Sequence, residues 1–340
     1  MVNRRQFLRM SFGGAALMLP GTVPGYGTPD SLLPKRKHIR RGRALGTNVT
    51  FTIFHADKKT ADLAIDEALA KIEHVEQLMS LYRPDSQLSI LNRKGVLRNP
   101  HPDLLAVLRK AKEISKLTQG AFDVTVQPLW KLYVDCSRAG AFTSGGRLPT
   151  ENEIQTVRQR VGWQHIHLQR DLICMNKAGV QVTLNGMAQG LAADMAQQAL
   201  KTRGIEHALI DAGEFNAIGQ PLQKDAWHIA IKHNRKPAER LCKTELRDRC
   251  LSTSGDYGTR FSENYRHHHL FDPRTGLSPT EISSVSVIAP NALDADALST
   301  AIFILGVDKG RDLVESMDHV DALFVTRSGH IEQTKGFAVL

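Results

Sequence analysis

The chain has 340 residues, long enough for two packed units or one large unit to bury a full hydrophobic core. Its formal net charge is +9, but residues 1–43 hold nine Lys and Arg against one acid, and the remaining 297 residues carry only +1. A nearly neutral body lacks the clustered cations from which phosphate-backbone binders draw their affinity, so we expect no nucleic-acid partner.

The N-terminus predicts an export signal. Arg4 and Arg5 precede Phe-Leu and an apolar run at residues 10–20, an arrangement that resembles a twin-arginine signal. This run of 11 residues is too short to span a membrane, and no cysteine follows it to carry a lipid anchor. We therefore expect residues 1–27 to be a twin-arginine export signal, residues 28–42 a basic flexible linker and residues 43–340 the folded domain of a periplasmic protein.

Apolar periodicity predicts the elements of the folded body in chain order. Residues 49–54 alternate as a strand does, and from Thr60 to about Tyr82 apolar residues recur every three or four positions, as in an amphipathic helix. The pattern then predicts helices at 101–118, 157–161 and 191–203, a surface loop at 137–146, a hairpin at 166–175, and strands at 208–210, 227–231 and 285–289. Strands and helices do not alternate strictly, which favours an α+β fold over a Rossmann sheet. No GxGxxG or P-loop sequence is present.

The cysteines give little information about function. Cys136, Cys174, Cys242 and Cys250 are unevenly spaced and form no CxxC pair, so we expect no zinc site. An exported protein can form disulfides, and Cys242 with Cys250 could close a loop. Four cysteines allow three pairings, and the sequence does not choose among them.

An acidic segment near the C-terminus suggests a site for a hard cation. Apolar residues at helical spacing follow Asn291, a suitable N-cap, and they place Asp296 and Thr300 one turn apart on the same face. Oxygen-only ligation favours Mg²⁺ or Ca²⁺ over zinc or copper. The simpler alternative is that acids in a first turn complement the helix dipole, and this cluster taken alone fits that alternative better.

Other segments add the remaining parts of a phosphoryl- or nucleotidyl-transfer site. The turn at residues 185–190 leads into a helix, where free N–H groups and the helix dipole suit a phosphate. Residues 253–255 offer hydroxyls and a close backbone approach. His269 is followed by Asp-Pro-Arg-Thr-Gly at residues 272–276, and it could act as a general base, although a solvated loop histidine is the alternative.

In these segments the chain resembles the FAD:protein FMN transferases, the ApbE-like family, over almost all of residues 43–340. The matching segments, in family order, are residues 45–47, 78–86, 91–92, 120–123, 185–190, 211–219, 253–255, 269–276 and 295–300. The resemblance implies an enzyme that cleaves the pyrophosphate of FAD, releases AMP and leaves FMN on a Thr or Ser of a partner flavoprotein. It also implies Mg²⁺ as cofactor and an α+β fold of two mixed sheet and helix subdomains, T-fold-like, with the nucleotide in the cleft between them.

The same resemblance assigns roles to individual residues. Asp296, Thr300 and a backbone carbonyl near Gly186 are the implied metal ligands, and His269 is the implied base at the acceptor hydroxyl. The implied FAD-binding positions are Leu45, Tyr82, Ala121, Phe122, Asp123, Thr183, Gln189 and Thr253.

Two departures from the family pattern lie in the turn before residue 190. Thr183 stands where the family commonly has Asp, and Gln189 stands where it has Lys, so we expect weaker or different contacts to FAD. The turn sequence, together with Gly213-Glu214, is similar to a NosX-like subgroup associated with nitrous oxide respiration and a membrane flavoprotein. Two alternatives stay open: a non-catalytic FAD-binding or assembly factor, and a pyrophosphatase that splits FAD to FMN and AMP.

Overall fold

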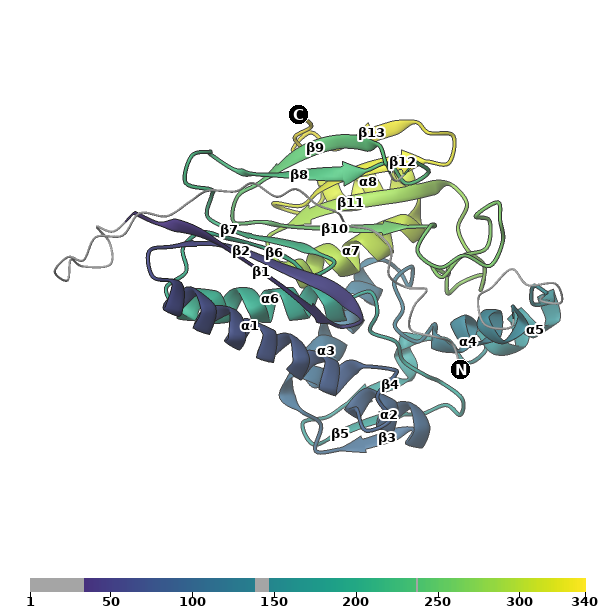
Figure 1. Ribbon diagram of the computed structural model, residues 1–340. Coiled ribbons are helices and arrows are strands. Elements are labelled where there is room, and N and C mark those ends of the chain that lie inside the picture. The colour runs from purple at the N-terminus through teal and green to yellow at the C-terminus, as the bar shows by residue number, and fades with distance from the viewer. Residues whose placement is uncertain (1–33, 138–146, 237) are drawn as a thin grey trace.

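A computed structural model describes residues 34–137, 147–236 and 238–340. The central feature is an eight-stranded sheet in the order β1-β2-β6-β7-β10-β11-β12-β13, in which every neighbouring pair is antiparallel (Figure 1). Its strands are β1 Arg36–Ala44, β2 Thr47–His55, β6 Ala208–Asp211, β7 Phe215–Ile218, β10 Cys250–Gly255, β11 Ile282–Ala289, β12 Asp321–Thr326 and β13 Ile331–Gln333. The expected α+β class is confirmed.

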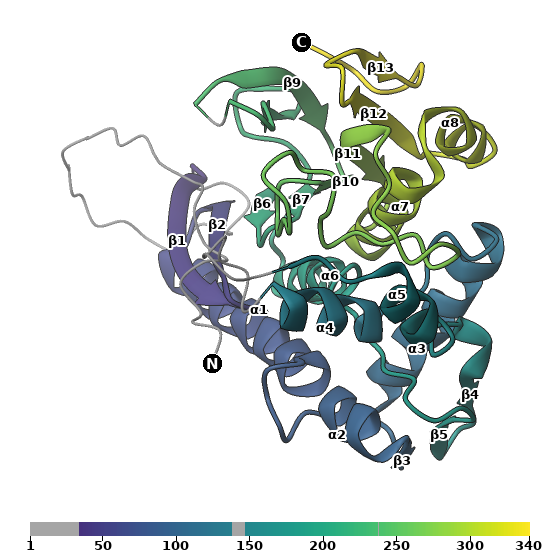
Figure 2. The same ribbon diagram turned by 90° about the vertical axis from the view of Figure 1, so that its right-hand side faces the viewer.

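Helices cover one face of this sheet and a hairpin covers the other. On the first face α6 (Ala188–Thr202) packs between α1 (Lys58–Met79) and α7 (Ala292–Leu305), and α8 (Val307–Glu315) follows beside β12 (Figures 1 and 2). On the second face the hairpin of β8 (Trp227–Lys232) and β9 (Arg240–Leu246) buries Trp227 and Ile229 against Leu251 and Ile288. The sheet therefore has an apolar core on each side.

A smaller unit of helices and short strands connects α1 to α6. It contains a three-stranded sheet, in the order β3-β5-β4, and it extends from the α1 end of the molecule (Figure 2). Its elements are α2 Gln87–Lys94, β3 Val96–Arg98, α3 Pro102–Leu117, α4 Gln127–Cys136, α5 Glu151–Arg158, a 3₁₀ turn η3 Trp163–His165, β4 Ile166–Leu168 and β5 Leu172–Met175.

The predicted flexible linker at residues 28–42 is wrong from residue 36 onward, because these residues form strand β1. The strand pairs with β2 along its whole length, from Arg36 opposite His55 to Ala44 opposite Thr47. Arg40 also forms an ion pair with Asp66 of α1 at 2.6 Å. The charges that made this segment look like a linker are those of an edge strand, whose basic side chains stay in solvent.

Most other predicted elements are present. The helix predicted from Thr60 is α1, which starts at Lys58 because the Asp57 side chain caps it by accepting from the Lys59 and Thr60 N–H groups. The helix predicted at 157–161 is wrong: α5 runs from Glu151 to Arg158, where Thr150 and Glu153 form a capping box.

Some predictions concern residues that are not described. The export signal at 1–27 and all but Ser137 of the loop at 137–146 lie outside the described residues. In the part that is described, no helix is both long enough and apolar enough to span a membrane. All four cysteines are free thiols, and Cys250 is buried.

Candidate active site

The site is built where the N-termini of α6 and α7 meet. A Cβ atom on Gly190 would lie 2.3 Å from the carbonyl oxygen of Ala292, so only glycine permits this approach. The Gly190 N–H then donates to Oδ2 of Asp296 at 3.1 Å. Asp194 of α6 accepts from the N–H groups of Ala292 and Leu293 at 2.8 and 2.9 Å, which caps α7 and fixes it against α6.

The three predicted metal ligands are brought together at this junction. Asp296 and Thr300 lie one turn apart on α7, and a Cβ atom on Gly186 would lie only 3.0 Å from Oγ1 of Thr300. The turn before α6 therefore faces the two α7 side chains. A carboxylate, a hydroxyl and backbone carbonyls at such a junction are the oxygen donors that Mg²⁺ and Ca²⁺ prefer.

Two buried carboxylates lie at this junction, and neither forms an ion pair with a Lys, Arg or His of the described residues. The pKa of Asp296 is raised to about 7, mainly by burial. The charge of Asp194 also raises it, and the hydrogen bond from the Gly190 N–H lowers it. Glu214 is also buried; burial first and the charge of Asp296 second raise its pKa well above the usual range. The Oε2 atom of Glu214 has no hydrogen-bond partner within residues 34–137, 147–236 and 238–340. Buried carboxylates with an unpaired oxygen fit a divalent cation.

Hydroxyls from strand β10 face α7 close to Thr300. Ser254 Oγ lies 2.7 Å from Ser299 Oγ and 3.3 Å from Thr300 Oγ1. Thr253 lies on the opposite face of the strand, where its Oγ1 contacts Ser286 at 2.8 Å. The Ser254 hydroxyl thus faces Thr300, while the side chain of Thr253, a predicted FAD-binding position, lies on the face of β10 away from α7.

His269 lies beside the segment that continues from β10. Its Nδ1 is 3.3 Å from the Thr259 N and 3.2 Å from the Thr259 carbonyl oxygen, and a Cβ atom on Gly258 would lie 2.8 Å from its Cε1. Burial lowers the pKa of His269, while the Thr259 hydrogen bond and the charge of Asp256 raise it. The imidazole is therefore neutral at pH 7 and able to accept a proton.

A buried ion pair supports this segment. Asp256 has no exposed surface, and Arg235 contacts it with two parallel hydrogen bonds, both 2.6 Å long. Such a bidentate pair holds the chain rigidly between Ser254 and Gly258. The positions of Asp256, Arg235 and Glu214 were not predicted, because their pairing depends on the folded sheet and not on a local motif.

The predicted nucleotide-binding positions fall into two groups, and the first is Tyr82 alone, beside a depression of about 450 Å³. Tyr82 lies on its wall and is 66% exposed. The remaining lining residues are Leu81, Ser89, Asn92, Arg93, Gln127, Trp130, Lys131, Gln181 and Asn185. Because Asn185 adjoins Gly186, the depression reaches the turn that faces Thr300. Its volume and its aromatic and basic lining suit a nucleotide ring system with phosphates.

The second group has structural contacts. Asp123 is buried, and its carboxylate accepts from the Thr125 N–H, the Thr125 hydroxyl and the Trp163 N–H. Ala121 and Phe122 are buried beside it, and the Phe122 ring is 3.7 Å from the Cβ position of Gly186. Leu45 has a left-handed backbone, with φ of 52°, and its N–H donates to Glu76 at 2.9 Å. These polar groups are already hydrogen-bonded within the protein, so these residues give the site its shape.

The two departures from the family pattern also have visible roles. Thr183 Oγ1 accepts from the Asn185 N–H at 3.3 Å, so the hydroxyl orders the turn. The amide of Gln189 lies against Gly213, where a Cβ atom would be 2.8 Å from Nε2. Gln189 therefore contacts the backbone of the β6–β7 turn that carries Glu214.

The arrangement defines a class of protein: buried oxygen donors for a hard cation, a neutral histidine and a neighbouring nucleotide-sized depression are the parts of a nucleotidyl-transfer enzyme. The model of the ApbE family matches residues 45–324, and the chain belongs to this family. The relative from Haemophilus influenzae named FAD:protein FMN transferase is 30% identical, over 84% of this chain and 88% of its own length. The enzyme of that name from Treponema pallidum is 27% identical, over 92% of this chain and 91% of its own.

Solved structures confirm the predicted ApbE-like fold. The apo form of the flavinyl transferase ApbE from Pseudomonas stutzeri superposes with a TM-score of 0.77 at 28% identity, over 89% of this chain and 96% of that one. The ApbE protein from Thermotoga maritima gives a TM-score of 0.78 at 27% identity, over 88% of this chain and 97% of that one. The chain is thus an enzyme of the ApbE family.

Proposed function

We propose that this protein transfers FMN from FAD to a Thr or Ser hydroxyl of a partner flavoprotein, with release of AMP and with Mg²⁺ as cofactor. The observation that carries the proposal is the buried pair of Asp296 and Glu214 beside Thr300 and Gly186. The relatives named FAD:protein FMN transferase support FAD as substrate and a protein as acceptor.

Each part of the site has a task in this reaction. Asp296, Thr300 and the Gly186 carbonyl would hold the cation. The chemistry that a bound Mg²⁺ supplies is neutralisation of the charge that develops as the pyrophosphate bond breaks. His269 removes the proton from the acceptor hydroxyl, for which a neutral imidazole is required. Tyr82 offers an aromatic face to a ring of FAD in the depression.

The location and the partner are part of the same proposal. The twin-arginine pattern at Arg4 and Arg5 supports export to the periplasm. The acceptor would then be a membrane flavoprotein with a periplasmic Thr or Ser, and the turn at 185–190 supports a partner in nitrous oxide respiration. Replacing both arginines with lysine should keep the protein in the cytoplasm, as measured by cell fractionation. Unchanged export would contradict the twin-arginine assignment.

The activity is tested with purified protein, FAD, Mg²⁺ and a candidate acceptor domain, followed by intact mass spectrometry. Transfer adds the mass of one FMN to the acceptor and releases AMP, and an acceptor with its Thr or Ser replaced by Ala should gain no mass. Free FMN and AMP without a modified acceptor would instead indicate a pyrophosphatase. FAD that stays bound and intact would indicate a binding or assembly factor. An Asp296→Asn variant separates metal-dependent turnover from background hydrolysis.

A further inference from the structure

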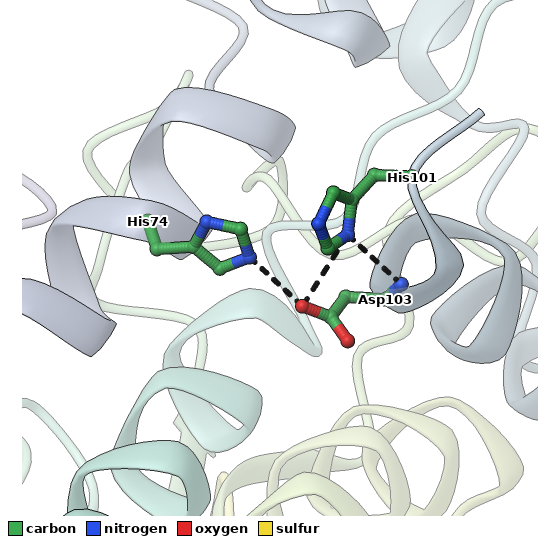
Figure 3. A group of neighbouring side chains, drawn as sticks. All are labelled: His74, His101 and Asp103. Atoms are coloured by element: carbon green, nitrogen blue, oxygen red, sulfur yellow. Dashed lines mark hydrogen bonds and ion pairs between the residues drawn. The ribbon is translucent and has the colours of Figure 1, made fainter. Parts of the chain in front are cut away.

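A second group of metal-binding side chains lies outside the site described above. His74 of α1, His101 at the N-cap of α3 and Asp103 in the first turn of α3 converge, and all three are half-buried (Figure 3). His74 Nε2 lies 2.8 Å from Asp103 Oδ2, and His101 Nδ1 lies 3.4 Å from the same oxygen. Across the described residues, only this trio of His, Cys, Asp or Glu brings three candidate ligand atoms within 4.8 Å of one another.

We propose that His74, His101 and Asp103 form a binding site for a transition-metal dication of the zinc type. Two imidazole nitrogens and one carboxylate oxygen are borderline ligands, which zinc and its neighbours prefer and magnesium does not. None of the three residues belongs to the oxygen-donor site at Asp296 and Thr300. The chain therefore has two cation sites that differ in donor type.

The spacing of the donor atoms fits such an ion. Four ligands at about 2.0–2.1 Å in a tetrahedron lie roughly 3.3 Å from one another. The separations of 2.8 and 3.4 Å to Asp103 Oδ2 fall on either side of that value. Half-exposed side chains can close the remaining difference by small rotations, and their exposure leaves a fourth position to water. The ion would replace the hydrogen that now lies between His74 and Asp103.

Neighbouring contacts hold the group in place. The N–H of His101 donates to Oε1 of Gln87 in α2 at 2.8 Å, and the two imidazole rings meet edge to face with centroids 4.7 Å apart (Figure 3). The Asp103 N–H donates to His101 Nδ1 at 3.2 Å, and an ion at Nδ1 would take the place of this bond. Binding would tie α1 to α3 beside α2. Because α1 ends at Met79, just before Leu81 and Tyr82 on the wall of the depression, the role is a clamp on the helix that leads into this wall.

The test is zinc binding by the full chain in excess Mg²⁺, measured by isothermal titration and by metal analysis after dialysis. We expect one equivalent of Zn²⁺ beyond any that the Asp296 site takes, and Co²⁺ should give the visible absorption of a tetrahedral site. His74→Ala and His101→Asn should each weaken zinc binding by at least roughly 10–100-fold. That is the loss expected for a residue that only orients a metal ligand, and these residues would be ligands themselves. Asparagine keeps an N-cap acceptor for α3, so this variant should fold normally.

A matched control separates a built site from an ordinary surface pair. His228 lies 3.3 Å from Glu245 and belongs to no group of three candidate ligands in the described part of the chain, so His228→Ala should leave zinc binding unchanged. Zn²⁺ should also raise the melting temperature of the wild type and not that of His74→Ala. Binding that persists in both trio variants, or that is lost only in Asp296→Asn, would overturn the proposal. So would a wild-type chain that retains no additional zinc.

Discussion

The metal-free protein should become more stable when the Asp296 charge is removed. In Asp296→Asn the amide oxygen can still accept from the Gly190 N–H, while the negative charge is lost. The pKa of Asp296 rises from 3.8 to about 7 on folding, which at about 1.36 kcal/mol for each unit of pKa corresponds to about 4 kcal/mol. Because Asp296 is only 5% exposed, solvent screening reduces this value little. We therefore expect Asp296→Asn to gain up to about 4 kcal/mol at pH 8.

The sign of the pH dependence follows from the direction of the change. An acid whose pKa is raised in the folded state binds its proton more tightly there than in the unfolded chain. The stability from this proton is fully present below pH 3.8, and it is lost as the pH rises to about 7. The difference between wild type and Asp296→Asn should therefore open across that interval. The charge of Asp296 also raises the pKa of Glu214, so the difference between the two proteins includes the relief of this second carboxylate.

The assay is urea unfolding followed by circular dichroism, in chelator and at a series of pH values. Asp312→Asn on α8 is the control, because this exposed aspartate lies in a helix outside the site and should change stability little. Addition of Mg²⁺ should stabilise the wild type at pH 8 and leave Asp296→Asn unchanged. Equal stability of the two proteins at pH 8 would refute the destabilising charge of Asp296. Equal stabilisation of both proteins by Mg²⁺ would refute its assignment as a metal ligand.

Three further changes test other parts of the site. His269→Ala should slow FMN transfer by about 10²-fold or more and leave FAD affinity unchanged; an unaffected rate would assign the base elsewhere. In the wild type, the pH at which the rate falls on the acid side should lie below 6.5, because burial lowers the pKa of His269. Gly186→Ala should weaken Mg²⁺ binding roughly tenfold or more, because its methyl group would press on Thr300 Oγ1 at 3.0 Å, and normal affinity in a titration would remove this turn from the metal site. Gln189→Lys should tighten FAD binding by about fivefold, or about 1 kcal/mol, measured by fluorescence titration; weaker binding would show that residue 189 does not face phosphate.

Local patterns account for the parts of the site that were predicted. The spacing of Asp296 and Thr300, and the cap at Asn291, follow from helix geometry and are visible in a few consecutive residues. The glycine turn at 185–190 follows from the same kind of local reading. That these two segments, over 100 residues apart, meet at one point depends on the close contact of Gly190 with Ala292, which only the fold reveals.

Parts that depend on tertiary structure were missed. Glu214 is identifiable as part of the site only because the β6–β7 turn buries it beside Asp296. Thr253 and Ser254 both carry a hydroxyl, and the sequence does not show which of the two faces α7. The fold places Ser254 on that side of β10. For β1 the local signal pointed the wrong way, since a highly charged edge strand and a solvated tether have the same composition.

The position of β1 determines where the protein can be truncated for laboratory work. A fragment started at residue 45, the first residue matched by the family model, would lose all of β1 and leave β2 as the outermost strand. Its free backbone groups would then be open to pairing with another copy, without the arginines that now screen that side. Recombinant versions should begin before Arg36, and shorter ones are expected to self-associate in light scattering.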